Sequence, residues 1–369
     1  MKEIKVDVLV VGGGPAGLSA AAESSAAGAS VLVAEADLHL GGQLVKQSHK
    51  FFGSKDEYAG SRGFDIAKLL RDEIFSGDSR VTAMLNTTVT GYYPEERAAT
   101  LMTGEEQYVT VFPQKIIVAN GAQERIIPFP NNDLPGVYGA GAVQTLMNVY
   151  GVIPGKKVLM IGAGNIGLIV SYQLLQAGVE VAAVLEGAPQ VGGYWVHAAK
   201  LRRLGVPILL RHSIKRAFGR EVVEGAEITE VDDKFQPVGS PMEVECDTIC
   251  LAVGLTPSSE LLWQAECRMK YVPSLCGYVP FRDPHMRTSN ADVWVAGDAS
   301  GIEEASAAMI EGRIAGLSAA ESLGCKIDAN RYNVFLARLE QLRAGEISEK
   351  IRTGIKAVAE WEGNSNERP

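Results

Sequence analysis

The hydrophobic pattern of the chain opens with a strand, a turn and a helix. An apolar run at residues 6–11 leads into a glycine-rich turn at 12–17 and an alanine-rich stretch at 18–27. A second apolar run, residues 30–34, ends at Glu35. Short continuous apolar runs are typical of strands buried in a parallel sheet, so this pattern predicts a β-α-β unit.

The turn of this unit has the glycine spacing of a dinucleotide-binding fingerprint. Gly12, Gly14 and Gly17 follow the pattern GxGxxG, in which the glycines allow a tight turn, a close approach to a pyrophosphate and close helix-strand packing. Glu35 stands where an acid accepts hydrogen bonds from a ribose hydroxyl group. A glycine turn can be purely structural, but a complete β-α-β unit with its acid favours nucleotide binding.

The same pattern occurs a second time. Residues 157–161 form the predicted strand, 162–167 the glycine loop, 168–177 the helix and 179–185 the next strand, which ends at Glu186. Two complete copies predict two bound dinucleotides. The candidate contacts of the second copy are Gly162, Gly164, Asn165, Ile166, Gly167 and Glu186.

The remaining segments complete a predicted fold of the α/β class. Residues 81–93 and 98–111 have the pattern of an antiparallel meander, and 115–119 that of a short buried strand. Residues 244–253 read as one further strand, and 305–323 as a helix. We therefore expect two Rossmann-like dinucleotide-binding domains, the second inserted into the first, with a short helical C-terminal tail.

Segments rich in glycine and proline mark the expected crossovers between the domains. The first domain is expected in two parts, residues 1–135 and 266–329, around an inserted domain at 136–265. The tail, residues 330–369, has apolar residues at helical spacing on both sides of a hinge at Gly345.

The apolar stripe of the last predicted helix has two possible roles. It consists of Ile347, Ile351, Ile355, Val358 and Trp361, and all of these but Val358 are candidates for the alternative role. Such a stripe is usually part of the core, which is the favoured interpretation, and the alternative is a contact with another subunit.

Composition narrows the classes of function. The 369 residues are 46% apolar and carry a formal net charge of −9, which disfavours nucleic acid and anionic lipid as partners. The N-terminal apolar run is interrupted by Asp7 and stopped by glycines, so neither a signal segment nor a membrane span is expected there, and a cytoplasmic location is expected. The five cysteines form no CxxC pair and no metal-binding pattern.

Two loops carry candidate chemistry. In the segment that follows Glu35, Gly42 and Gln43 can bring backbone and an amide close to a cofactor, and Lys50 can supply charge near a reactive ring. An ordinary surface loop is at least as good an interpretation for Lys50. Asp298 directly follows a predicted strand, where it can hold polyol hydroxyl groups or cap the next helix.

The motifs, in their order along nearly the whole chain, resemble those of the two-dinucleotide-binding flavoproteins of the pyridine nucleotide-disulfide oxidoreductase class. The resemblance implies FAD on the first domain and NAD(H) on the inserted domain. Its implied FAD contacts are Gly12, Gly14, Pro15, Ala16, Gly17, Glu35, Gly42, Gln43, Val89, Asn120, Gly121, Gly297 and Asp298. Its implied NAD(H) contacts are the residues of the second copy together with Gly254.

Within this class, residues 48–53, 287–289, 297–302 and 311–316 look most like a narrower group. These are the alpha subunits of dye-linked proline or hydroxyproline dehydrogenases, opine oxidases, hydrogen cyanide synthase and sarcosine oxidase. The resemblance implies an electron-handling subunit whose partner, a beta subunit with its own flavin, oxidises the amine. The chain lacks the cysteine-rich iron-sulfur segment of many relatives, so an iron-sulfur centre would come from another subunit.

Two alternatives to the favoured function, an electron-handling flavoprotein subunit, remain open. A thioredoxin-reductase-like disulfide reductase needs a dithiol beside the flavin, which the missing CxxC argues against. A scaffold whose second fingerprint binds a nucleotide without turnover would show no bleaching of the flavin by NADH.

Overall fold

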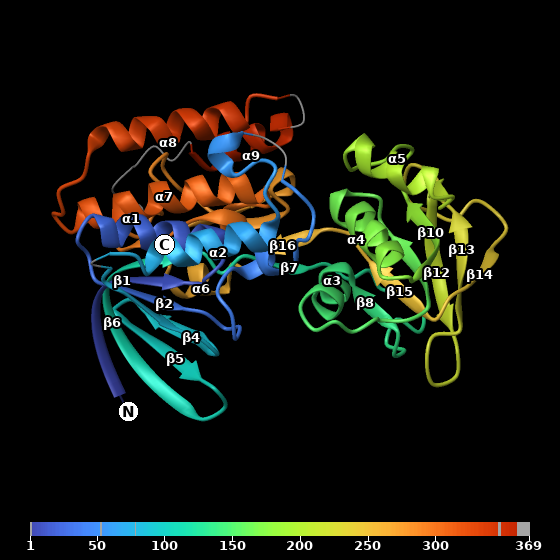
Figure 1. The fold of residues 1–369 in the computed structure, drawn as a ribbon, viewed down its shortest axis with the longest axis horizontal. Coiled ribbons are helices and arrows are strands. Elements are labelled where there is room, and N and C mark those ends of the chain that lie inside the picture. Colours follow the sequence, from blue (N-terminus) through green and yellow to red (C-terminus); the bar gives the residue numbers. More distant parts are fainter. Residues whose placement is uncertain (1, 52–53, 78, 346–347, 360–369) are drawn as a thin grey trace. The chain divides into compact units, whose positions relative to one another are not determined.

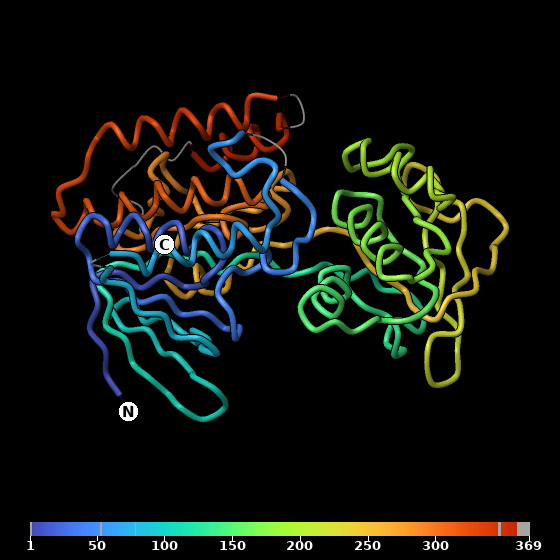
Figure 2. The backbone as a smooth tube through the Cα atoms, in the orientation of Figure 1, coloured from blue at the N-terminus to red at the C-terminus, as the bar shows by residue number. Residues whose placement is uncertain are grey.

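A computed structural model describes residues 2–51, 54–77, 79–345 and 348–359. The chain forms two compact units (Figure 1). Unit 1 comprises residues 1–123 and 256–369, and unit 2 comprises residues 124–255. Figure 2 shows that the chain enters unit 2 once and returns once, so unit 2 is an insertion.

Unit 1 is built on one sheet that is parallel in its centre and antiparallel at one edge. β1 pairs in parallel with β2 and β6, while β6 also pairs in parallel with β19 and antiparallel with β5. The sheet contains β1 (Lys2–Val11), β2 (Val31–Ala34), β3 (Val81–Met84), β4 (Thr87–Tyr93), β5 (Ala98–Thr103), β6 (Gln107–Val118) and β19 (Val293–Val295).

Two segments of this sheet differ from the sequence-based prediction. The expected strand 81–93 divides at Asn86, whose φ of 48° turns the chain between β3 and β4. The expected strand 98–111 divides into β5 and the first part of β6, and β6 continues through most of the expected strand 115–119. β6 joins the meander to the parallel centre because one half of it pairs with β5 and the other half with β19.

Helices cover both faces of the sheet. On one face, α1 (Pro15–Ala26), α2 (Gly63–Ile74) and α7 (Ala305–Ser322) form a core cluster with alternate residues of β1 and β2. On the other face, α6 (Glu260–Gln264) packs against the meander. α1 and α7 approach backbone to backbone, because a side chain at Gly312 or Gly316 would clash with the carbonyl oxygens of Ala16 or Ala20.

Unit 2 has a fully parallel sheet in the order β11-β10-β9-β15-β8. A three-stranded antiparallel sheet, β12-β13-β14, packs beside it. The strands are β8 (Val137–Gly139), β9 (Lys157–Ile161), β10 (Glu180–Glu186), β11 (Ile208–Leu210), β12 (His212–Phe218), β13 (Gly225–Glu230), β14 (Met242–Glu245) and β15 (Thr248–Leu251). The helices are α3 (Ala140–Asn148), α4 (Asn165–Gln176) and α5 (Trp195–Arg203).

The expected single strand at 244–253 is two strands in different sheets. The chain leaves β14 and enters β15 through Cys246 and Asp247. Cys246 and Cys250 are buried free thiols, and burial raises the pKa of Cys246 to about 12. Both therefore act as small core residues.

The crossovers lie earlier in the chain than the sequence indicated. They are formed by β7 (Ala122–Glu124) and β16 (Leu255–Pro257), which pair with each other. The breaker-rich segment before residue 135 belongs to unit 2 because Phe129 is buried in a core cluster of that unit. Leu262, in α6, is buried in the core of unit 1.

The C-terminal segment forms two helices, α8 (Ala329–Leu342) and α9 (Glu349–Ala359). α8 buries Phe335 and Leu339 against the core that contains α7. α9 packs against the hairpin of β17 (Met269–Val272) and β18 (Gly277–Pro280).

The structure describes only part of the apolar stripe that was predicted for the last helix. Ile351 and Ile355 pack partly buried in this second contact, which supports the core interpretation for them. Ile347 and Trp361 lie outside the described residues. Among the described residues, no helix combines the length and apolar character that a bilayer crossing requires.

The contact between α1 and α7 predicts the effect of one added methyl group. Gly316→Ala should lower the free energy of unfolding by about 1–3 kcal/mol, because the new β-carbon has no space beside the carbonyl oxygen of Ala20. The exposed Gly345 has open space around it, so Gly345→Ala is the matched control and should change stability little. Chemical denaturation of both variants measures the difference, and equal stability would refute the contact.

Candidate functional site

The first fingerprint lies at the carboxyl ends of β1 and β6. Gly12 has a φ of 98°, and a β-carbon there would clash with the carbonyl oxygen of Ala119. A β-carbon at Gly17 would clash with the carbonyl oxygen of Gly12. Both glycines are therefore required by the protein's own backbone.

The middle glycine is different. A β-carbon built at Gly14 would approach other described atoms no closer than 3.8 Å, at the Cα of Gly42. Its φ of −76° suits any residue. The fold itself therefore leaves an open space above Gly14, in front of the first residues of α1.

This open space faces the start of α1. Gly14 has no side chain with which to cap the helix, and Pro15, its first residue, has no N–H. The backbone N–H groups of the first turn and the helix dipole favour a negative charge at this end. The arrangement is chemically suited to a phosphate group.

Glu35 closes the fingerprint turn from the side. Its Oε2 accepts a hydrogen bond from the N–H of Gly13 at 2.6 Å, and its Oε1 accepts one from the N–H of Asp37 at 2.8 Å. Burial raises the pKa of Glu35. Each carboxylate oxygen can accept a further hydrogen bond, which leaves capacity for a hydroxyl group.

The segment after Glu35 folds back onto the turn. The N–H of Gly41 donates to the carbonyl oxygen of Gly13 at 2.8 Å, and Gly42 begins a short 3-10 helix (Gly42–Lys46) against Gly14. Gln43, the next residue, is exposed. Gly42 therefore packs against the first fingerprint, and the contact of Gly42 and Gln43 with a cofactor stays a prediction.

Three other candidate residues lie on neighbouring strands or loops. Asn120 and Gly121 follow β6, directly after the Ala119 carbonyl that faces Gly12. Val89 lies on β4, a strand that begins where the N–H of Thr87 donates to the carbonyl oxygen of Glu35.

Lys50 is exposed and lies at an isolated bridge to Arg62, and its role stays a prediction. Phe52 and Gly53, which belong to the same predicted loop, lie outside the described residues.

The turn at Gly297 and Asp298 belongs to the later part of the sequence of unit 1 and contacts α1, the helix that follows the first fingerprint. Gly297 has a φ of 70°, and a β-carbon there would lie 2.9 Å from the Cβ of Ala16. Burial raises the pKa of Asp298 to about 6. Asp298 is not the N-cap of α7, because that helix begins only at Ala305.

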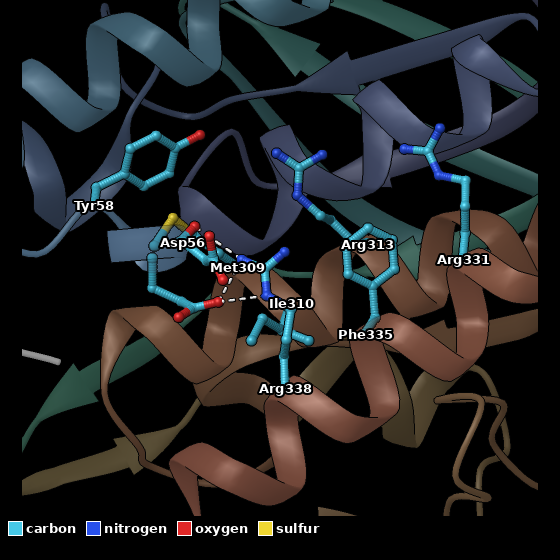
Figure 3. Close-up of a pocket in the computed structure, with 9 residues that line it drawn as sticks. Asp56, Tyr58, Met309, Ile310, Arg313, Arg331, Phe335 and Arg338 are labelled. Carbon is cyan, nitrogen blue, oxygen red and sulfur yellow. Dashed lines mark hydrogen bonds and ion pairs between the residues drawn. The ribbon is translucent and has the colours of Figure 1, made fainter. Parts of the chain in front are cut away.

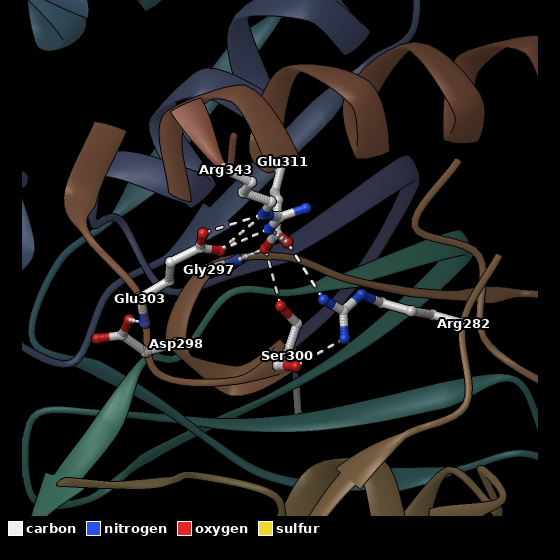
Figure 4. Close-up of polar contacts among 7 residues, drawn as sticks. All are labelled: Arg282, Gly297, Asp298, Ser300, Glu303, Glu311 and Arg343. Carbon is white, nitrogen blue, oxygen red and sulfur yellow. Dashed lines mark hydrogen bonds and ion pairs between the residues drawn. The ribbon is translucent and has the colours of Figure 1, made fainter. Parts of the chain in front are cut away.

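A buried carboxylate holds this turn in place (Figure 4). Oε2 of Glu311 accepts hydrogen bonds from the N–H of Gly297 at 2.9 Å and from the hydroxyl of Ser300 at 2.8 Å. Its Oε1 lies 3.3 Å from Arg282 and 2.6 Å from Arg343. Burial raises the pKa of Glu311, but the two guanidinium groups outweigh it and the net shift is downward.

This network was missed at the level of sequence. Glu311 is the only charged residue among the buried positions of α7, and such a lone acid on a buried helix is the signal that could have found it. Its partners could not have been found, because Arg282 and Arg343 come from distant segments.

The second fingerprint repeats the geometry of the first. A β-carbon at Gly162 would clash with the carbonyl oxygen of Ala252. A β-carbon at Gly167 would clash with the carbonyl oxygen of Gly162. At Gly164, no other atom in the described part of the chain lies within 4 Å of a built β-carbon. α4 begins directly afterwards at Asn165.

The acid of the second unit is held like that of the first. Glu186 accepts hydrogen bonds from the N–H groups of Ala163 at 2.9 Å and Ala188 at 3.0 Å. Ile166 is exposed at the start of α4, and Gly254 has a φ of 114° just after β15.

A second element missed from the sequence is the pair Gly192-Gly193. The N–H of Gly193 donates to the carbonyl oxygen of Ala163 at 3.0 Å, as Gly41 does to Gly13. The N–H of Tyr194 donates to Oδ1 of Asn165 at 2.7 Å. The signal was present, because a glycine pair begins six residues after the acid in both copies.

A cavity in unit 1 is lined by residues 56–58 and by side chains of helices α7 and α8 (Figure 3). Three guanidinium groups, from Arg313, Arg331 and Arg338, surround the ring of Phe335 at 5.8–5.9 Å. Each of them is already paired with a glutamate, so the cavity does not offer a free cationic site. Across the described residues, no three His, Cys, Asp or Glu side chains gather as metal ligands.

Comparison with protein families and curated proteins gives a match over most of the chain. The family model described as pyridine nucleotide-disulphide oxidoreductase matches residues 6–312. An opine oxidase subunit from Agrobacterium tumefaciens is 29% identical over 86% of this chain and 66% of its own length. Hydrogen cyanide synthase subunit HcnB of Pseudomonas protegens is 28% identical over 85% of this chain and 70% of its own length.

Solved structures share the fold. L-proline dehydrogenase from P. horikoshii superimposes with a TM-score of 0.69 and 22% identity, over 92% of this chain and 59% of that one. Thioredoxin reductase from T. acidophilum superimposes with a TM-score of 0.71 and 20% identity, over 86% of this chain and 99% of that one. The chain thus spans about two thirds of the opine oxidase relative and less of the proline dehydrogenase chain.

The Glu311 network predicts a large effect of removing one charge. Glu311→Gln should lower the free energy of unfolding at pH 7 by about 3–5 kcal/mol, because two buried guanidinium groups lose their shared anion. Since folding lowers the pKa of Glu311, its stabilisation is complete at neutral pH and is lost as the pH falls below about 4.

Urea denaturation at pH 7 and pH 3 measures this effect, and the difference from the parent protein should shrink at the lower pH. The exposed Glu340 on α8 provides the matched control, Glu340→Gln. An equal loss of stability at both pH values would contradict the charged role of Glu311.

Proposed function

The chain belongs to the pyridine nucleotide-disulphide oxidoreductase family and is an FAD-dependent oxidoreductase, and on that premise we propose that it is the electron-handling subunit of an amine or amino-acid dehydrogenase. The substrate of the whole complex would be of the proline, hydroxyproline, sarcosine or opine type. The observation that supports the binding of two nucleotides is the pair of open spaces above Gly14 and Gly164, one in each unit.

Unit 1 is proposed to hold FAD. The open space above Gly14 at the start of α1 suits the pyrophosphate, and Glu35 has oxygens available to the adenosine ribose. Asp298 would accept hydrogen bonds from the ribityl chain. Such donors favour the ionised carboxylate, which offsets the burial that raises its pKa.

Unit 2 is proposed to hold NAD(H). The space above Gly164 suits its pyrophosphate, and Glu186 suits a ribose with two free hydroxyl groups. A 2′-phosphate beside this carboxylate would be repelled, so NADH is expected over NADPH. Bound FAD would accept a hydride from NADH, and the task of the chain's residues is to position the two nucleotides and exclude water.

The proposal of partner subunits comes from the relatives. The matched proteins are named as subunits of opine oxidase and of hydrogen cyanide synthase. By analogy, a beta subunit with its own flavin would oxidise the amine, and an iron-sulfur subunit is a further possible partner.

Disulfide reduction is the second candidate function, favoured by the fold shared with thioredoxin reductase. It requires a reactive dithiol. The sequence has no CxxC pair, and burial raises the thiol pKa of Cys246, Cys250 and Cys267, which opposes thiolate chemistry at these three positions.

The two fingerprints can be tested against each other. Gly14→Val should yield a folded protein without flavin, because the valine would fill the proposed pyrophosphate space and the nearest described atom is 3.8 Å from its β-carbon. Gly164→Val should retain flavin but lose its reduction by NADH. Visible absorbance and circular dichroism measure both results, and a fully yellow Gly14→Val protein would refute the FAD assignment.

The division of labour is tested with the purified chain, checked for other subunits. It should pass electrons from NADH to an artificial dye but show no dehydrogenation of proline, hydroxyproline, sarcosine or opines. Amine oxidation should appear only when a second flavoprotein subunit is added. Turnover of any of these amines by the single chain, at the rate of a complete complex, would make it a self-sufficient dehydrogenase.

A further inference from the structure

We propose that the turn between β13 and β14 recognises the adenosine end of the nucleotide in unit 2. In this proposal Phe235 stacks on the adenine ring, and an ion pair between Arg211 and Asp233 helps to exclude a 2′-phosphate. The inference rests on the proposed function, because it assumes that unit 2 binds NAD(H).

The ring of Phe235 packs on the residue that follows the acid of the fingerprint. A β-carbon at Gly187 would lie 2.6 Å from Cε1 of Phe235, so the ring lies directly against the backbone of this glycine. Phe235 is nevertheless 63% exposed, so much of the ring remains accessible. A large exposed aromatic ring with one side anchored on the backbone is suited to stacking with a planar ligand.

The backbone holds Phe235 in an unusual conformation. Its φ is 60°, in the left-handed region that a bulky residue enters only at a cost. The turn is closed around it by Asp232, whose Oδ1 accepts hydrogen bonds from the N–H groups of Lys234 and Gln236 at 2.8 and 2.9 Å. A glycine or asparagine would suit this backbone better, so the turn alone does not explain the phenylalanine.

The position of the ring fits the adenine end of the site. Glu186 is the last residue of β10, and a ribose held by this acid places its base beyond the carboxyl end of the strand. Gly187 is the next residue, so the ring of Phe235 borders the space that the base would enter.

A cation follows the strand that pairs with Glu186, and it already has an anionic partner. Leu210 pairs with Glu186 across the parallel strands, and Arg211 follows it, with its N–H donating to the carbonyl oxygen of Ala188 at 3.2 Å. Nη1 of Arg211 lies 2.7 Å from Oδ1 of Asp233. In this proposal Asp233 pairs with the guanidinium group of Arg211, which could otherwise bind a 2′-phosphate.

Isothermal titration of the flavin-loaded full chain with 5′-AMP, 2′,5′-ADP, NAD+ and nicotinamide mononucleotide tests the proposal. Phe235→Ala should weaken 5′-AMP and NAD+ by about fivefold to tenfold and leave nicotinamide mononucleotide unchanged, and Phe235→Trp should restore binding. Val238→Ala, an exposed apolar change nearby, is the control. Asp233→Asn should raise the affinity for 2′,5′-ADP relative to 5′-AMP at least about threefold.

A fifth variant separates recognition from folding. Phe235→Gly relieves the left-handed backbone, so its melting temperature should not fall, yet it should weaken 5′-AMP as Phe235→Ala does. Unchanged 5′-AMP binding in both variants, or equal weakening of nicotinamide mononucleotide, would overturn the inference while the proposed function stands. If the parent chain binds neither 5′-AMP nor NAD+, the NAD(H) site itself is refuted, and the inference fails with it.

Discussion

Unit 1 depends on a contact at Ala16 between two helices, α1 and α7, that lie far apart in the sequence. Gly312 on α7 packs against the carbonyl oxygen of Ala16 on α1, and Gly297 packs against its Cβ. The first fingerprint and the turn that carries Asp298 are thereby held at one point, although almost the whole sequence separates them. A larger residue at either glycine would separate the two halves of the proposed FAD site.

The charge buried beside this contact extends its influence into the C-terminal segment. Glu311 precedes Gly312, and it satisfies the N–H of Gly297 while attracting Arg343, which follows α8. A carboxylate that is only 2% exposed is tolerable because two guanidinium groups compensate it. The C-terminal helices are therefore part of the structure that holds the proposed FAD site, in addition to covering the core.

Much of this arrangement could be predicted from the sequence, because it depends on local patterns. Glycine spacing, apolar runs and the terminal acids identify both β-α-β units, since each feature acts within about thirty residues. Strand boundaries were less predictable. The break at Cys246 and Asp247 separates two sheets without a glycine or proline, and the length of β6 is set by partners distant in sequence. The Glu311 network was hidden for the same reason.

The two nucleotide units share one geometry, so differences in what they bind must arise outside it. In both, two glycines are fixed by backbone contact, the middle glycine faces open space, and the acid ties its strand to the turn. Unit 1 adds the Gly297 turn and a buried carboxylate, which come from a later segment of the chain. Unit 2 instead adds an antiparallel sheet whose turn brings Phe235 to Gly187. Under the proposed assignment, the separate specificities of the two units come from the segments packed against this shared geometry, and the fingerprints do not encode those segments.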